Sequence, residues 1–141
     1  MKINRRQFLS NAAICTGPLI LPSRFFGKEA PMGTLNIGLG GSGVRCAAHT
    51  SDFSSIPGVR IVAVCDIWTE QTRLAKIEID KINGDSHCKR YHDFRELIAD
   101  PEIDVESVAV PDHWHALIAI EAANHGKHIY LEKPFAYTIE E

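Results

Sequence analysis

Three glycines and one acidic residue near the start of the chain are spaced as in sites that bind a phosphorylated ligand. Gly38, Gly40 and Gly43 fit the pattern G-x-G-x-x-G, and Asp66 follows Gly43 by 23 residues. Such a pattern places a pyrophosphate on backbone N–H groups at the start of a helix, and the later carboxylate reaches ribose hydroxyls. We therefore predict a dinucleotide site rather than a loop that is merely rich in glycine.

The residues of the glycine segment have separate expected tasks. Gly38 should allow a tight turn after the strand, Gly40 should admit the pyrophosphate, and Gly43 should let the next helix pack closely on the sheet. Gly41 and Ser42 lie between these glycines and are expected to bind the cofactor as well.

The residues after Asp66 indicate which cofactor is bound. Ile67 and Trp68 follow it, so no Arg or Lys stands there to receive a 2′-phosphate. This favours NAD over NADP.

Alternating strands and helices must bring these residues together. Apolar strands flank the glycine segment from Thr34 and up to Asp66, and the pattern predicts further strands over 88–91, 103–110 and 128–131, with helices over 69–83, 94–99 and about 113–124. This alternation predicts a doubly wound, Rossmann-like α/β domain with a parallel sheet. Residues 38–43, 66, 111–115 and 132–134 should then meet in one crevice at the carboxyl ends of the strands.

Details of the helices follow from their sequences. Thr69 and Asp93 are expected N-caps, and Gly84 and Gly126 are expected to end helices. Apolar residues at helical spacing should mark the packed faces, and they are Leu74, Ile77 and Ile82 in one helix and Ala116, Leu117, Ile120 and Ala123 in another.

Composition narrows the class of protein. The 141 residues suffice for one domain, with 45% hydrophobic and 23% charged residues, as in a globular protein. The four cysteines form no C-x-x-C pair, so no zinc site is predicted. Beyond residue 30 there are 10 basic and 17 acidic residues, a balance that repels nucleic acid.

Residues 1–32 are interpreted as a signal segment ahead of a nucleotide-binding domain over 33–141. Arg5 and Arg6 precede an apolar run over 8–21 that is too short to span a bilayer. The segment resembles a twin-arginine signal, which predicts export to the periplasm without a stable membrane anchor. The alternative is a cytoplasmic protein with a basic amino terminus.

Two histidines near the crevice could suggest a metal. His113 and His115 open a predicted helix two residues apart, where they point in different directions, so a helix-opening cofactor contact is favoured and no metal is predicted. The other histidines, His49 among them, are given no role.

Five segments in order resemble the amino-terminal domain of the Gfo/Idh/MocA family, the oxidoreductases related to glucose-fructose oxidoreductase and inositol dehydrogenase. They are the glycine segment, 62–66, 91–97, Pro-Asp-His-Trp-His at 111–115 and 126–134 with Glu-Lys-Pro at its end. The resemblance implies NAD-dependent hydride transfer to or from a sugar, cyclitol or related polyol. It implies that Lys133 is catalytic and also contacts the cofactor, together with Glu132, Val110, Pro111 and His115.

The chain departs from the family pattern in three ways. Glu106 occupies a strand position that is usually apolar, and we expect it at the rim of the sheet or paired. Val110 replaces a common Thr before Pro111. Members of the family also continue into a second domain, so the chain is interpreted as truncated, inactive alone, with homo-oligomerisation left open for the full-length form.

Two alternatives to a dehydrogenase remain open. One is a glycosidase of the same superfamily, which holds NAD tightly and returns it unchanged, although such members tend to lack the lysine at the place of Lys133. The other is a noncatalytic nucleotide-binding fragment.

Overall fold

A five-stranded parallel sheet forms the centre of the domain. The computed structural model describes residues 33–140. The strands are β1 (Leu35–Gly40), β2 (Val59–Cys65), β3 (Lys89–Tyr91), β4 (Val105–Val108) and β5 (His128–Leu131). They lie in the order β3-β2-β1-β4-β5, so the predicted doubly wound α/β class is confirmed.

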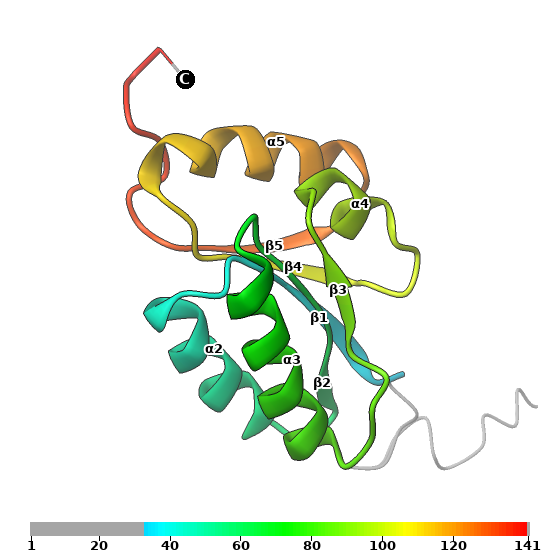
Figure 1. Cartoon of the computed structure of the whole chain (residues 1–141). Coiled ribbons are helices and arrows are strands. Elements are labelled where there is room, and N and C mark those ends of the chain that lie inside the picture. Colours follow the sequence, from blue (N-terminus) through cyan, green and yellow to red (C-terminus); the bar gives the residue numbers. More distant parts are fainter. Residues whose placement is uncertain (1–32, 141) are drawn as a thin grey trace, which may run out of the picture. The chain divides into compact units, whose positions relative to one another are not determined.

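Helices cover both faces of this sheet. They are α2 (Val44–Ser54), α3 (Thr69–Asn83), α4 (Phe94–Ala99) and α5 (His115–Asn124), with a 3₁₀ turn, η2 (Asp112–Trp114), before α5. Figure 1 shows α2 and α3 on one face and α4 and α5 on the other. None of these helices is long and apolar enough to cross a membrane.

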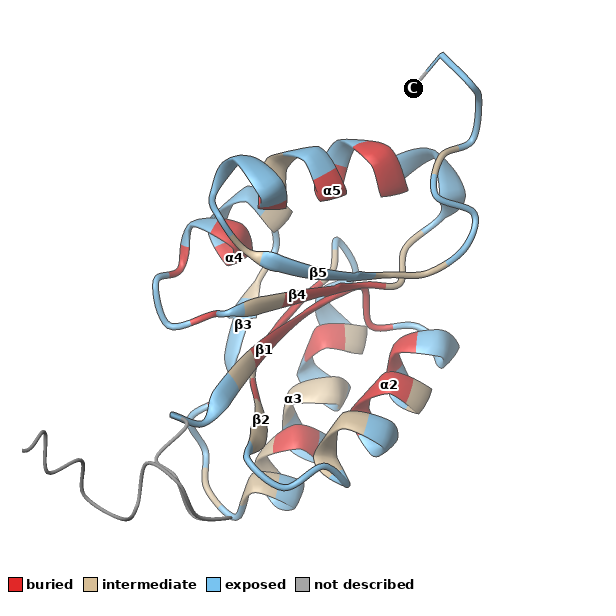
Figure 2. Cartoon of the chain, turned by 180° about the vertical axis from the view of Figure 1, so that it is seen from behind, coloured by how far each residue is buried: buried red, intermediate tan, exposed pale blue. Residues whose placement is uncertain are grey.

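The core lies where the helices meet the central strands. Along β1, Ile37 and Leu39 pack on the α2 and α3 side with Ile61, Val64 and Ile79. Figure 2 shows the buried residues on the inner faces of the helices and along the middle strands. Burying one side chain of this size contributes about 1.5–3 kcal/mol, so this cluster is a main source of stability.

The helix ends largely follow the sequence. The Asp93 side chain accepts a hydrogen bond from the Arg95 N–H and caps α4 as predicted. Gly84 and Gly126 have φ of 74° and 69°, which favours glycine where α3 and α5 end. The prediction for Thr69 was wrong, because Thr69 is the first helical residue and Trp68 precedes it in the cap position without a side-chain hydrogen bond.

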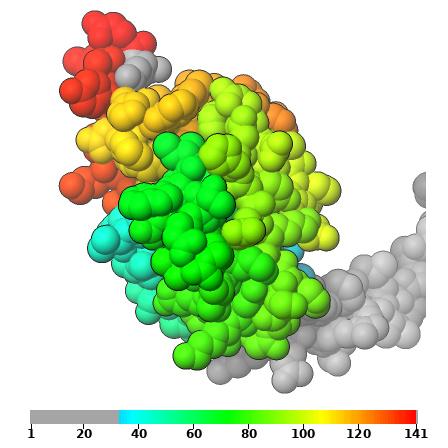
Figure 3. Space-filling model, in the orientation of Figure 1, coloured from blue at the N-terminus to red at the C-terminus, as the bar shows by residue number. Residues whose placement is uncertain are grey.

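The apolar faces predicted for the two long helices were mostly wrong. Leu74, Ile77 and Ile82 are 49%, 53% and 46% exposed, and α3 packs through Ile79 and Ala75 instead. The outer surface of α3 lies uncovered in Figure 3. In α5 the exposed side chains include Leu117 and Ile120, whereas Ala116, Ile118, Ala119 and Ala122 are buried, and Ile118 and Ala122 cluster with Val108 of β4. Small side chains let a helix approach a sheet closely, so size alone did not identify the buried face.

Glu106 is buried in the middle of the sheet, so the expectation of a rim position or a partner was wrong. The strand itself is shorter than predicted, Val105–Val108. Glu106 pairs in register with Gly38 and is 0% exposed, and neither carboxyl oxygen has a hydrogen-bond partner. A Cβ at Gly38 would lie 3.0 Å from Glu106 Oε2, so the glycine provides the space for this side chain. Burial raises the pKa of the Glu106 carboxyl well above its usual value, which favours the neutral acid.

Candidate functional site

The tight turn at the end of β1 is made by Gly41. Its φ is 100°, its N–H donates to the Cys65 carbonyl at 2.8 Å, and a Cβ there would lie 2.4 Å from the Ala109 carbonyl oxygen. Only glycine fits this position. The turn predicted at Gly38 was therefore wrong, since Gly38 lies inside β1.

The other two glycines of the motif also differ from expectation. A Cβ at Gly40 would lie 2.7 Å from Glu106 Oε1, so within the protein this glycine accommodates a buried carboxyl. A Cβ at Gly43 would meet nothing within 4 Å, so close packing of α2 on the sheet does not require this glycine. Gly43 is the N-cap residue of α2 and leaves open space in front of the helix start, where backbone N–H groups favour an anion.

Asp66 lies against the glycine turn, as predicted. Its Oδ2 accepts hydrogen bonds from the Ser42 N–H at 2.9 Å and the Ser42 hydroxyl at 2.8 Å, and its Oδ1 accepts one from the Trp68 N–H at 2.9 Å. These bonds fix the carboxylate at the tip of β2. The structure thus brings together the two parts of the motif, which are 24 residues apart.

A largely apolar pocket of about 330 Å³ opens beside this carboxylate. Its walls come from the glycine turn, the β2 tip, α4 and the segment after β4. They include Gly40, Gly41, Gly43, Asp66, Ile67, Phe94, Val110, Pro111 and Trp114. An apolar slot with one acidic residue can hold a flat ring and its attached sugar.

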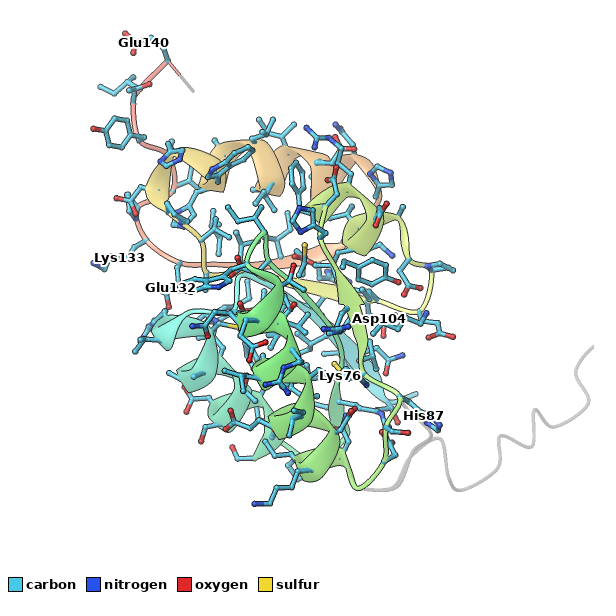
Figure 4. The ribbon with its side chains drawn as sticks, viewed as in Figure 1. Lys76, His87, Asp104, Glu132, Lys133 and Glu140 are labelled. Atoms are coloured by element: carbon cyan, nitrogen blue, oxygen red, sulfur yellow. The ribbon has the colours of Figure 1, made fainter. Side chains whose placement is uncertain are left out.

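A second pocket, of about 440 Å³, carries most of the charge. It is lined by Arg45, Ala109, Val110, Asp112, His115, Glu132 and Lys133. Ala109 and Val110 line both pockets, so the two adjoin at the tip of β4. In Figure 4, Glu132 lies beside the start of α2, whereas the Lys133 side chain extends outward. Each segment expected at the crevice therefore contributes residues to these two adjoining pockets, whereas Gly38 lies inside β1 and lines neither.

His115 links two loops of this pocket. The side chain is 1% exposed, with Nδ1 2.5 Å from the Pro134 carbonyl oxygen and Nε2 2.9 Å from the Val110 carbonyl oxygen. The Lys133–Pro134 peptide bond is cis. Both ring nitrogens thus face backbone, and within residues 33–140 no group of three or more His, Cys, Asp or Glu side chains is arranged to hold a metal ion.

Glu132 belongs to an ion pair that the sequence did not reveal. Its Oε1 lies 2.6 Å from Arg45 Nε and 2.9 Å from His49 Nε2. The hydrogen bonds from Arg45 and then His49 lower the pKa of the Glu132 carboxyl to about 2. Both of these ion-pair partners of Glu132 lie on α2.

Three residues of the site were missed by sequence reasoning. They are Arg45, His49 and Ser107, whose hydroxyl lies 2.9 Å from His49 Nδ1. Arg45 and His49 stand four residues apart just after the glycine turn, which places them on one face of the helix. That spacing was the available signal, but nothing in it indicated Glu132 as the partner, because the two segments are more than 80 residues apart.

Comparison with known proteins agrees with this geometry. A model described as "Oxidoreductase family, NAD-binding Rossmann fold" matches residues 35–141. A glycosyl hydrolase family 109 protein of Solibacter usitatus is 34% identical over 116 residues, covering 79% of this chain and 26% of the relative. A second such protein, from Shewanella sp. strain ANA-3, is 35% identical over 136 residues, covering 94% and 30%.

Two solved structures have the same fold. The myo-inositol dehydrogenase of Lactobacillus casei in complex with NAD(H) and myo-inositol has a TM-score of 0.69 and 30% identity, over 76% of this chain and 30% of that chain. The scyllo-inositol dehydrogenase of the same organism with bound NAD(H) and scyllo-inositol has a TM-score of 0.68 and 25% identity, over 76% and 30%. The chain thus spans about a quarter to a third of the length of these proteins.

Proposed function

The chain belongs to the Gfo/Idh/MocA oxidoreductase family, and from this premise we propose that it is the nucleotide-binding part of an enzyme that transfers a hydride between NAD and a polyol. The observation that carries the proposal is the meeting of two pockets at Ala109 and Val110, one beside Asp66 and one beside Lys133. A sugar or cyclitol is favoured as substrate because two related structures are complexes with NAD(H) and either myo-inositol or scyllo-inositol.

The residues present fit a dinucleotide. The space before α2 has no side chain at Gly43 to fill it, and the Asp66 carboxylate is part of the lining of the apolar pocket. When bound, the nicotinamide supplies a site that accepts or donates a hydride. Asp66 would hold the adenosine ribose hydroxyls, and the N-terminus of α2 would face the pyrophosphate.

Lys133 is the proposed catalytic residue. As a neutral amine its side chain can accept the proton of the substrate hydroxyl, and as the resulting ammonium it can hold the product oxygen and release that proton to solvent. The backbone at Val110 and Pro111 would border the nicotinamide, and His115 would keep this wall in place through its two contacts with backbone carbonyl oxygens. Oxidation of an alcohol needs a group that removes its proton, and the charged pocket provides one at Lys133.

NAD is the proposed cofactor in preference to NADP. The support is the Asp66 carboxylate, which hydrogen bonds from Ser42 and Trp68 hold at the tip of β2. In folds of this kind such a carboxylate binds the ribose hydroxyls, one of which carries the 2′-phosphate in NADP. Two negative groups would repel each other there.

The proposed function is tested on the full chain, meaning residues 1–141 joined to a second domain of the kind that members of the family carry. Purified protein is incubated with NAD⁺ or NADP⁺ and a panel containing myo-inositol, scyllo-inositol and common aldoses, and the reduced nicotinamide is followed by its fluorescence. We expect net NADH formation with at least one polyol, and NAD⁺ binding without turnover by residues 1–141 alone. No affinity for NAD⁺ in calorimetry would overturn the proposal.

A glycosidase is the second candidate, because the curated relatives quoted above are glycosyl hydrolase family 109 proteins. Such an enzyme would use NAD for a transient oxidation and give no net NADH. Incubation with p-nitrophenyl glycosides separates the two candidates. Release of p-nitrophenol without accumulation of NADH would favour the glycosidase, whereas NADH formed with a free polyol would favour the dehydrogenase.

We also propose export to the periplasm. The support is Arg5 and Arg6 ahead of the short apolar run, and these residues lie outside the part of the chain that the structure describes. Cell fractionation of the wild type and of the Arg5→Lys, Arg6→Lys variant tests this. We expect the variant to stay in the cytoplasm; an unchanged distribution would contradict export by this route.

A further inference from the structure

A chain of contacts runs from the middle of the sheet to the residue before Lys133. Ser107 on β4 lies 2.9 Å from His49 Nδ1, and His49 Nε2 lies 2.9 Å from Glu132 Oε1. Ser107 and His49 are 1% and 3% exposed, whereas Arg45, which also contacts Glu132, has a side chain that is 62% exposed. The Ser107–His49 contact is therefore shielded from water, whereas the Arg45–Glu132 contact is not.

The chemistry of Glu132 sets the direction of these hydrogen bonds. Its ionised carboxylate can only accept, so the hydrogen lies on His49 Nε2 and is donated to Glu132. Nδ1 can then accept from the Ser107 hydroxyl. Each buried polar group has a partner in this arrangement, and losing one partner leaves the other unsatisfied at a cost of about 1–3 kcal/mol.

Lys133 itself has no such anchor. Within residues 33–140 no hydrogen bond or ion pair holds its ammonium group, and the residue is exposed. The residues on either side are held instead: Glu132 contacts His49, and the Pro134 carbonyl oxygen contacts His115. The location of Lys133 in the pocket therefore depends on these neighbours.

We propose that His49 is a positioning residue that fixes Lys133 in the pocket by joining Glu132 to Ser107. The inference rests on the proposed function for the statement that Lys133 is catalytic, but the contacts themselves do not depend on it. His49 lies on α2, whose N-terminus borders the glycine turn, so one helix serves both the proposed phosphate site and the segment of Lys133.

A purely structural role is the alternative. The His49 ring also lies against two aromatic rings, with centroid distances of 5.6 Å to Phe53 and 5.2 Å to Tyr130. Removing the ring could loosen this cluster without any specific effect on Lys133. The variants must therefore distinguish the contribution of Nε2, which faces Glu132, from that of Nδ1, which faces Ser107.

Two amide substitutions make this separation in the full chain. The amide nitrogen of His49→Gln can reach the place of Nε2 and keep the donor to Glu132. The shorter side chain of His49→Asn reaches only the place of Nδ1 and loses that donor. Thr50→Val is the matched control, because Thr50 is a buried neighbour on α2 whose hydroxyl donates to the Cys46 carbonyl oxygen of the same helix.

The first measurement needs neither cofactor nor substrate. The rate at which an amine reagent labels Lys133 is read by mass spectrometry, with Lys81 on the surface of α3 as the internal reference. We expect the rate for Lys133 to match wild type in His49→Gln and Thr50→Val and to change about tenfold in His49→Asn, the factor for one lost hydrogen bond to a charged group.

The second measurement follows kcat and KM with NAD⁺ and a polyol that the wild type oxidises. We expect kcat to fall in His49→Asn, with KM for NAD⁺ unchanged and recovery in His49→Gln. Equal labelling of Lys133 in all variants, or equal changes in His49→Gln and His49→Asn, would overturn the positioning role. If the wild type bound no NAD⁺, the proposed function would fail, while the labelling result would still decide the role of His49.

Discussion

The two ends of the cleft are built in different ways. At the glycine turn, the polar groups come from a single stretch of sequence: Gly41 makes the turn and Ser42 donates to Asp66. The pocket beside them is largely apolar, and later segments complete its walls. At the other end, charged side chains from α2 and the tip of β5 meet over the β4 strand. The first end is suited to binding, and the second contains groups that can move protons.

The difference teaches which kind of site can be inferred from sequence. A motif within one βαβ unit carries its own spacing, so the sequence alone assigns Asp66 to the glycine turn. The contacts of Glu132 with Arg45 and His49 join segments more than 80 residues apart, and no local pattern reports them. The residues of the binding end can therefore be predicted from sequence, whereas those of the reactive end come together only in the completed fold.

The largest expected effect tests the reactive end. Lys133→Met in the full chain should lower kcat by about 10³-fold, within the range for loss of a general acid or base, while the Kd for NAD⁺ stays the same. Calorimetry and steady-state turnover measure the two quantities. Lys81→Met, at an exposed site on α3, is the matched control. Turnover at the wild-type rate would show that Lys133 is not catalytic, and the proposed difference between the binding end and the reactive end would then be wrong.

A change at the binding end should alter cofactor choice and leave chemistry intact. Asp66→Ser with Ile67→Arg removes the carboxylate and adds a cation, so the ratio of the NADP⁺ and NAD⁺ affinities should rise by about 10²-fold, as for one or two charge-assisted hydrogen bonds. Titration with each cofactor measures the ratio, and Ile67→Gln controls for the change of side chain. An unchanged ratio would mean that Asp66 does not contact the ribose.

The fold was predicted well because alternation along the chain determines it. Parallel strands joined by helices allow few arrangements, and the glycines at 84 and 126 and the cap at Asp93 mark helix ends through local chemistry. The buried faces of α3 and α5 were not predicted, because each helix carries apolar residues on more than one side. Which side is buried depends on contact with the sheet, through Ile79 in α3 and Ala122 in α5.

Glycine roles in the site were only partly predictable. The pattern G-x-G-x-x-G identified the region, but it did not show that Gly38 and Gly40 lie beside Glu106 on the next strand. Their missing side chains leave space for a buried acid, and that space depends on the register between β1 and β4. His49 was missed for the same reason, since its partners lie on β4 and after β5.

Glu106, which lies beneath the glycine turn, should make the free energy of unfolding depend on pH. Its pKa is raised in the folded state, so the unfolded chain ionises first as pH rises above about 4.5, and the folded state loses up to about 1.4 kcal/mol per pH unit until its own pKa is reached. Glu106→Gln should remove this slope. Denaturant unfolding of the full chain at several pH values measures it, with Glu78→Gln on the surface of α3 as the control. Parallel slopes for wild type and Glu106→Gln would show that the buried carboxyl is paired or ionised.

Glu132 should give a smaller effect of opposite sign at the other end of the cleft. Its pKa is lowered to about 2 by Arg45 and His49, so its contribution to stability is present above the ordinary carboxyl pKa and is lost as pH falls toward 2. Because Arg45 is largely exposed, water weakens the pair, and Glu132→Gln should lower the melting temperature only slightly near neutral pH and not at all in strong acid. Thermal unfolding between pH 2 and neutral pH measures this effect. Comparison with the Glu106→Gln series tests whether the two carboxyls change stability in opposite directions as the pH rises. If the contributions of Glu106 and Glu132 to stability both fell as the pH rose, Glu132 would not be held as an anion. The assignment of a hydrogen on His49 Nε2, donated to Glu132, would then be wrong.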